Sequence, residues 1–306
     1  MDSWIPIVVS TVTAATPLAI AALGVLINER AGVLNLGVEG MMLVGAVIAF
    51  AVGVSTGSLL LGYAAAVAAG AAVSLIFAVL TLNLQTNQVA TGLALALFGI
   101  GLSAFIGRPF VGTPIERVPL LDIPLLSSLP LVGPLLFHYD AVVYGSLILY
   151  AAVAWFLYRS EAGLKLRAIG EAPAIAHSLG YPVTRMRYLA VLFGGAMSGL
   201  AGAYLSTALT PMWVEGMSAG RGWIVLALVV FATWRPLRVL LGAYLFGGVT
   251  VLQLHAQALG LSVPSEFLSM LPYAATIVVL VIICRNPQTI LLNQPASLGR
   301  SFHPDA

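Results

Sequence analysis

The chain has 306 residues, of which 60% are hydrophobic and only 8% are charged, and its mean hydropathy is +1.03. Because a soluble domain ordinarily carries about 25% charged residues, this composition excludes a soluble protein. The formal net charge of +2 is too small to indicate nucleic-acid binding. A single cysteine, Cys284, excludes an internal disulfide, and the four histidines have no spacing that suits a metal site.

Long apolar stretches separated by short polar connections predict transmembrane helices. A stretch of about 17 to 25 residues can cross a hydrocarbon core about 30 Å thick, and continuous apolar runs are unlike the alternating strands of an outer-membrane barrel. The stretches are residues 5–27, 41–54, 58–80, 88–106, 141–158, 188–209, 222–234, 239–258 and 270–284. We predict an all-α polytopic membrane protein, one domain over residues 1–306, with about nine spans in a range of eight to ten.

Two of these stretches, 41–54 and 222–234, are short for a full crossing. Irregular backbone inside a membrane is tolerated only where protein or a wet cavity surrounds it. We therefore predict broken or re-entrant segments at these two places, buried among the other helices.

The connection at 159–187 is rich in basic residues. They are Arg159, Lys165, Arg167, Arg185 and Arg187. Short basic loops remain on the cytoplasmic side, so this connection is predicted to be cytoplasmic, together with a polar C-terminal tail at 285–306. The loop at 107–140 then lies outside. It contains six prolines, and two interpretations stay open: a solvated connector, or a docking surface for an extracytoplasmic partner.

Sequence motifs for catalysis are missing from the chain. Lys165 is the only lysine and is followed by leucine, whereas a phosphate-binding loop requires Gly-Lys followed by Ser or Thr. No nucleophile elbow and no zinc-protease motif is present. The chain is therefore predicted not to be an enzyme and to need no cofactor, and any ATP that powers it must be bound by another polypeptide.

A short amphipathic helix is predicted inside the cytoplasmic loop. Its apolar stripe consists of Ala172, Ile175, Ala176 and Leu179 at helical spacing. Pro173 suits its first turn and Gly180 its end, while Glu171 lies beside the positive end of its dipole. A helix of about two turns is unstable alone. Either the membrane domain covers the stripe, or the stripe inserts into a groove of a partner.

A small-residue face follows in the next span. Gly195 and Gly199 form a G-x-x-x-G pattern that Gly202 extends. Such a face lets two helices approach closely. Internal packing is the favoured use, with a subunit interface as the alternative.

The stretch "INERAGVLNLGVEGMMLVG" places polar residues beside the first span. In one interpretation it is a cytoplasmic turn. In the other, it re-enters the membrane, and Asn35 and Glu39 line a translocation path near a half-helix end. A charge at this depth needs a partner, for which Arg30 is the candidate. Asn87 and Gln88, before the fourth span, are further candidates for the path.

Two motifs resemble one protein family. The loop sequence "RAIGEAPAIAHSLG", followed by "SGLAGA", is similar to the conserved cytoplasmic loop of ABC importer permeases of the branched-chain amino acid, ribose and nucleoside group. The stretch "ERAGVLNLGVEGMMLVGA" resembles the N-terminal signature of its nucleoside and simple-sugar members. In the loop, Arg167, Gly170, Glu171, Pro173 and Ala176 match the family pattern, whereas His177 and Ser178 lie at variable positions.

The resemblance implies a type II ABC importer fold in the plasma membrane, the inner membrane in bacteria. It implies a permease that imports nucleosides or simple sugars, with branched-chain amino acids as the alternative substrate and an autonomous ion-coupled transporter as the alternative class. The implied partners are a cytoplasmic ATPase, a second permease subunit of the same or a different kind, and an extracytoplasmic substrate-binding protein. The loop would transmit the motion of the ATPase to the spans. The residues assigned to this role are Arg167, Gly170, Glu171, Pro173, Ile175, Ala176, Leu179 and Gly180.

Overall fold

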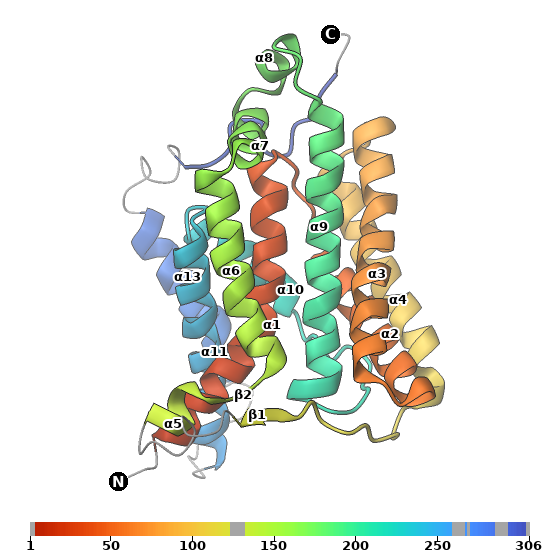
Figure 1. Cartoon of the computed structure of the whole chain (residues 1–306), viewed down its shortest axis with the longest axis vertical. Helices are drawn as coiled ribbons and strands as arrows, with labels where there is room; N and C mark the ends of the chain where they lie inside the picture. Colours follow the sequence, from red (N-terminus) through yellow and green to blue (C-terminus); the bar gives the residue numbers. More distant parts are fainter. Residues whose placement is uncertain (1–3, 123–131, 259–266, 268–269, 285–292, 304–306) are drawn as a thin grey trace.

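The structure is a computed structural model that describes residues 4–122, 132–258, 267, 270–284 and 293–303. Its long helices run side by side in a bundle, with α7 and α8 at one end and the N-terminus at the other (Figure 1). The helices are α1 (Ile5–Arg30), α2 (Val38–Thr56), α3 (Leu59–Ala78), α4 (Gln88–Gly107), α5 (Val132–Leu136), α6 (Ala141–Arg159), α7 (Glu161–Glu171), α8 (Pro173–Ser178), α9 (Val183–Tyr204), α10 (Arg221–Phe231), α11 (Pro236–Ala258) and α13 (Leu271–Cys284). The π-helical turns Val79–Asn83 and Leu205–Leu209 extend α3 and α9.

Each of the nine predicted apolar stretches contains a helix, so the predicted all-α membrane fold is confirmed. Within the described residues, seven helices are long and apolar enough to cross a membrane. The prediction of a short helix at 222–234 is confirmed by α10, which has 11 residues. The stretch at 41–54 is not short for a crossing as predicted, because α2 begins at Val38 and has 19 residues.

The helices α1 and α2 form the buried centre of the bundle. Every residue of α1 from Ala15 to Arg30 is buried, and α2 is buried from Val38 to Val47. A helix that is apolar on all sides is stable only when other helices surround it. Here α9, α10 and α11 pack around α1, while α3, α4 and α9 pack around α2. The peripheral helices expose large apolar side chains such as Leu60, Phe105 and Ile148, as a surface in contact with lipid requires.

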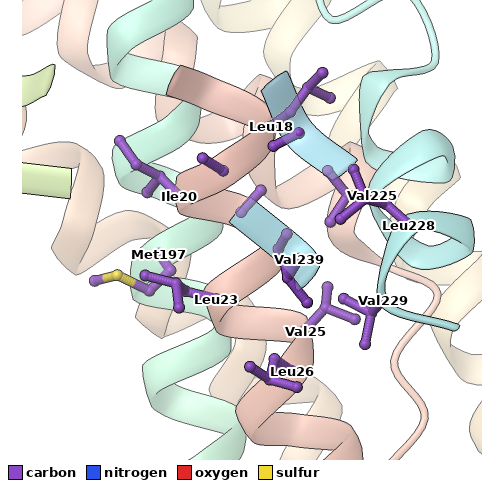
Figure 2. Close-up of a cluster of buried hydrophobic side chains, with 14 of the residues drawn as sticks. Leu18, Ile20, Leu23, Val25, Leu26, Met197, Val225, Leu228, Val229 and Val239 are labelled. Carbon is purple, nitrogen blue, oxygen red and sulfur yellow. The ribbon is translucent and has the colours of Figure 1, made fainter. Parts of the chain in front are cut away.

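The largest hydrophobic cluster joins α1 to α9, α10 and α11. In Figure 2, Leu23 and Leu26 of α1 lie near Met197 of α9 and Val229 of α10. Val239 of α11 belongs to the same cluster. The short helix α10 is therefore held inside the bundle by apolar contacts, although it is too short to cross the membrane.

The predicted outer loop contains more regular structure than its prolines suggest. Strands β1 (Leu120–Asp122) and β2 (His138–Asp140) form an antiparallel pair, with Leu121 opposite Tyr139. The five-residue helix α5 precedes β2. These elements lie at the end of the bundle opposite α7 and α8 (Figure 1).

The three glycines of the predicted small-residue face pack inside this chain. A Cβ on Gly195 would lie 2.3 Å from the Ser74 side chain, and one on Gly199 would lie 2.2 Å from the carbonyl oxygen of Ala66. At Gly202, the distance to the carbonyl oxygen of Met42 would be 1.9 Å. The absence of side chains at these positions lets α9 lie against the backbones of α2 and α3.

We expect Gly202→Ala to lower the free energy of unfolding by about 3 kcal/mol, because the added methyl group forces α9 away from α2. Gly145→Ala is the matched control, since a Cβ there meets nothing within 4 Å. In a helix interior that control should be neutral or stabilising by up to about 1 kcal/mol. Thermal denaturation of both purified variants measures the difference. An equal loss of stability in both would contradict the packing role of Gly202.

Candidate functional site

The stretch between α1 and α2 runs from one end of the bundle into its interior. Along α4, Gln88 contacts Leu34 and Gly99 contacts Gly40, while Gly107 contacts Trp213. At a rise of about 1.5 Å per residue, Gly99 lies about 17 Å from Gln88 and about 12 Å from Gly107. The start of α2 therefore lies near the middle of the bundle, not at the end that carries α7 and α8.

Glu39, in the first turn of α2, accepts three hydrogen bonds at this depth. Its Oε1 accepts from the Ser218 hydroxyl at 2.6 Å and from the Gly220 N–H at 2.9 Å, and its Oε2 accepts from the Gly222 N–H at 2.6 Å. The two amides belong to the N-terminus of α10, where a negative charge is favoured by the helix dipole. The carboxylate thus joins α2 to a half-helix inside the membrane.

Glycine at 222 is required for this contact. A Cβ there would lie 2.6 Å from the backbone nitrogen and Cα of Glu39. Arg221, the next residue toward the N-terminus, is close enough to interact electrostatically with Glu39, and its Nη1 donates to the carbonyls of Met217 and Ser218 at 3.2 Å.

The prediction that Arg30 pairs with Glu39 is wrong. Its Nε and Nη2 donate to the carbonyl oxygen of Trp234 at 3.1 and 2.7 Å, at the turn between α10 and α11. The neighbouring Glu29 accepts a hydrogen bond from the Trp234 indole N–H. Arg30 ends α1 at the end of the bundle that carries α7 and α8, whereas Glu39 lies in the first turn of α2 near mid-depth, so the irregular segment between them keeps the two charges apart.

The other predicted path residues lie nearer the end that carries α7 and α8. Asn35 is buried, and its Oδ1 accepts from the Gly37 N–H at 2.8 Å, which forms the turn before α2. Gln88 is also buried and accepts from the Leu34 N–H at 2.8 Å. Asn87 is exposed and caps α4 through the Ala90 N–H at 3.0 Å. Asn35 and Gln88 therefore lie around the stretch before α2, apart from Glu39, and Asn87 lies beside Gln88.

Basic side chains gather at the end of the bundle that carries α7 and α8. Among the described residues, this end holds Arg30, Arg159, Lys165, Arg167, Arg185, Arg187, Arg235, Arg238 and Arg300. Arg108 and Arg117 lie at the opposite end, where Arg117 donates to the carbonyl of Ala208. From the distribution of positive charge we predict that the α7 and α8 end faces the cytoplasm.

We expect cysteines placed at Ser178 and Glu116, in a Cys284→Ala background, to react from opposite sides of the membrane. Both positions are exposed, Ser178 on α8 and Glu116 in the outer loop. A membrane-impermeant thiol reagent should label Glu116→Cys in right-side-out vesicles and Ser178→Cys in inverted vesicles. Labelling of both from one side would contradict the orientation.

The predicted amphipathic helix of the loop is α8, and only part of its stripe is covered. Pro173 is its first residue, and Gly180 follows it with φ of +84°. Ala176 is buried in a cluster with Ile169 and Val183. Ile175 and Leu179 are 64% and 68% exposed. The membrane domain therefore does not cover these two large apolar side chains.

Gly170 of the coupling loop packs directly against the end of α1. It lies inside α7, where a Cβ would be 2.1 Å from the carbonyl oxygen of Arg30. Its own carbonyl accepts from the Ser297 hydroxyl at 2.7 Å. The change of direction occurs at Ala172, between α7 and α8. Gly170 is therefore a close contact between the loop and α1, because any side chain would separate them.

The loop is also held by residues that we did not predict. Arg187 is buried and donates to the carbonyl of Ala31 at 3.1 Å and to the Ser297 hydroxyl at 3.0 Å. The tail residue Ser297 thus links α1, α7 and α9. Residues 285–292 of the predicted tail lie outside the described residues. The periodicity of the sequence does not predict a contact of this kind. It is evident only from the hydrogen bonds of the folded structure.

Arg167 and Glu171 border a polar cavity of about 590 Å³ beside the end of α1. The Arg167 guanidinium lies 5.5 Å from the ring of Tyr158, and its buried Nε has no hydrogen-bond partner. Glu171 is exposed and accepts from the Ala296 N–H at 3.3 Å. Both side chains are therefore available at the cytoplasmic surface of the loop.

Comparison with known proteins agrees with this architecture. Residues 7–281 match the family described as branched-chain amino acid transport system / permease component. The chain is 44% identical to a putative glucose ABC transporter permease of Haloferax volcanii, with 96% of each chain covered. It is 33% identical to a guanosine ABC transporter permease of Bacillus subtilis and 32% identical to a nucleoside ABC transporter permease of Lactococcus lactis, with 90% of each chain covered in both cases.

The fold and these relatives define a class: the permease subunit of an ABC importer, a multi-pass membrane protein without a catalytic role. The chain belongs to the family of branched-chain amino acid transport system permease components.

Proposed function

We propose that this permease translocates a nucleoside or a simple sugar by alternating access, powered by ATPase subunits on separate chains. The names of the relatives carry this proposal, since proteins that match over at least 90% of their length are named for glucose, guanosine and nucleosides. These compounds share a hydroxylated sugar ring. The absence of a phosphate-binding loop from the sequence supports the assignment of ATP to a partner.

The loop from 159 to 187 is proposed to receive the motion of the ATPase. The exposed side chains of Ile175 and Leu179 on α8 support this role, because two large apolar groups at helical spacing suit a groove on a partner. Pro173 and Gly180 set the ends of α8, and Ala176 anchors it. Arg167 and Glu171 add opposite charges beside it. Gly170 joins the loop to α1, so movement of α8 reaches the centre of the bundle.

The half-helix α10 is proposed as the element of the path that changes position during transport. Glu39 supports this proposal, because it holds the N-terminus of α10 at mid-depth. Broken helices that end near the middle of the membrane are common at the binding sites of transporters. Asn35, Asn87 and Gln88 are proposed to line the translocation path on its cytoplasmic side.

The remaining proposed partners are a second permease subunit and an extracytoplasmic substrate-binding protein. The outer segment with β1 and β2 is proposed as the surface for the binding protein, at the end opposite α8. Residues 1–306 form one membrane domain in this proposal.

Uptake by a reconstituted transporter tests the proposal. Proteoliposomes that contain the permease, its ATPase and its binding protein should accumulate guanosine or glucose only when ATP is present on the side of the membrane that carries the ATPase. The permease alone should neither bind nor hydrolyse ATP. Uptake of leucine in preference to both would replace the proposed substrate class with branched-chain amino acids, and uptake without the ATPase would indicate an autonomous transporter.

A further inference from the structure

A crevice opens between α6 and α9 directly beneath α7. In Figure 1, α7 lies above the gap between these helices, and α1 lies behind it. The cavity has a volume of about 360 Å³, and its walls are four residues of α6 and four of α9. Ile27 of α1 forms its floor, while Ala162 and Leu166 of α7 form its roof. All these residues are apolar.

The size of the crevice suits one leaflet of a membrane. Leu149 to Phe156 on α6, and Met186 to Phe193 on α9, each extend for about 10 Å at the rise of an α-helix. Half of a hydrocarbon core is about 15 Å thick. The length of the crevice therefore matches most of one leaflet.

The outer face of α6 at this level presents exposed apolar and aromatic side chains that suit contact with lipid. Ile148 is exposed within the hydrocarbon depth, and Trp155 and Tyr158 are exposed at the cytoplasmic end of the helix. Tryptophan and tyrosine are enriched where hydrocarbon meets headgroups. The crevice beside this face is thus open to lipid.

A second cavity, of about 500 Å³, continues the crevice to the cytoplasmic surface. The two share Ala162, Met186 and Leu189 as lining residues, and the second adds polar groups. These are Glu161, Lys165, Tyr181 and Arg185. The apolar crevice therefore leads directly to an opening lined by these four polar residues, which we call the mouth.

The mouth carries a net positive charge. Arg185 is exposed and has neither an ion pair nor a hydrogen bond from its side chain among the described residues. Lys165 pairs with Glu161 at 2.6 Å, and this hydrogen bond raises the pKa of Lys165 and lowers that of Glu161. An exposed pair of this kind contributes little stability, so the Lys165 ammonium can also reach a bound anion.

From this geometry we infer that the α6–α9 crevice is a binding site for an anionic phospholipid of the cytoplasmic leaflet. One acyl chain occupies the apolar crevice, and the phosphate lies at Arg185 and Lys165, with Tyr181 beside it. Basic side chains near the membrane surface attract anionic headgroups, by about 1 kcal/mol each. The lipid would contact α7, which forms the roof of the crevice and the first part of the coupling loop.

Native mass spectrometry of the full chain in a non-ionic detergent tests the inference. Phosphatidylglycerol and phosphatidylcholine with the same acyl chains are the two probes. Arg185→Ala should weaken phosphatidylglycerol binding about fivefold and leave phosphatidylcholine binding unchanged. Ala152→Phe fills the crevice from an exposed position and should weaken both lipids.

Two matched variants serve as controls. Arg159→Ala removes a basic residue at the end of α6 that lines neither cavity, and Ala151→Phe adds a ring on α6 outside the crevice. Both should bind the lipids as the parent does. Equal loss in Arg159→Ala and Arg185→Ala, or unchanged binding in Ala152→Phe, would overturn the site in favour of non-specific lipid contact. A change of oligomeric state in Ala152→Phe without a change in lipid binding would assign the crevice to a second copy of the chain.

Discussion

Replacing Glu39 with alanine is expected to abolish substrate uptake and to lower the free energy of unfolding by about 3 to 5 kcal/mol. The substitution leaves the amides of Gly220 and Gly222 and the hydroxyl of Ser218 without their acceptor. Each buried group without a partner costs about 1 to 3 kcal/mol. The N-terminus of α10 should then move away from α2.

Graded variants separate this role from a general loss of charge. Glu39→Gln keeps the size and one acceptor oxygen, and should lose less stability than the alanine variant. Asn35→Ala removes one hydrogen bond of the neighbouring turn, at a cost of about 1 kcal/mol. Glu116→Ala removes an exposed carboxylate and should leave the free energy of unfolding unchanged. Thermal denaturation and uptake are measured together. Parental stability and uptake in Glu39→Ala would contradict the role of this residue.

The double substitution Ile175→Asp and Leu179→Asp is expected to weaken association with the ATPase at least a hundredfold. Burial of one such side chain in an interface contributes about 1.5 to 3 kcal/mol, and a factor of ten corresponds to about 1.4 kcal/mol. Both side chains are exposed in the permease, so its own stability should not change. Co-purification and ATP-driven uptake measure the effect.

Ser178→Asp is the control for added charge, because Ser178 is exposed on the same short helix but lies outside the apolar stripe. Glu171→Lys reverses an exposed charge beside α8 and should reduce coupling without unfolding the permease. Gly170→Val is unsuitable for this purpose, since it would clash with the carbonyl of Arg30 and disturb the bundle. Normal co-purification of the Ile175 and Leu179 variant would remove α8 from the ATPase contact.

Local patterns predicted the elements of this protein well. Apolar stretches predicted the spans because a helix in a membrane must satisfy its own backbone and present apolar side chains to lipid. Pro173 and Gly180 predicted α8 because each suits one end of a helix through its own backbone. The glycines at 195, 199 and 202 predicted a close helix contact for a similar reason, as they leave the helix surface flat.

Local patterns could not predict contacts between residues that are far apart in the sequence. Arg30 is nine positions from Glu39 and a natural candidate partner, yet it binds the carbonyl of Trp234, 204 positions away. The partners of Glu39 are 179 to 183 positions distant. Ser297 binds Gly170 and Arg187, although it lies in a tail whose sequence shows only a polar composition.

The sequence by itself therefore determined that the chain is a helical membrane protein, where its spans lie, which loop is basic and which family signature it carries. These properties depend on composition and on spacing within a few turns of chain. Tertiary structure decided that Glu39 holds the half-helix α10 near mid-depth, that Gly170 is a contact with α1, and that Ile175 and Leu179 stay uncovered while Ala176 is buried. The physical reason is that a buried polar group must find a partner wherever the packed helices bring one, and that placement depends on the whole bundle.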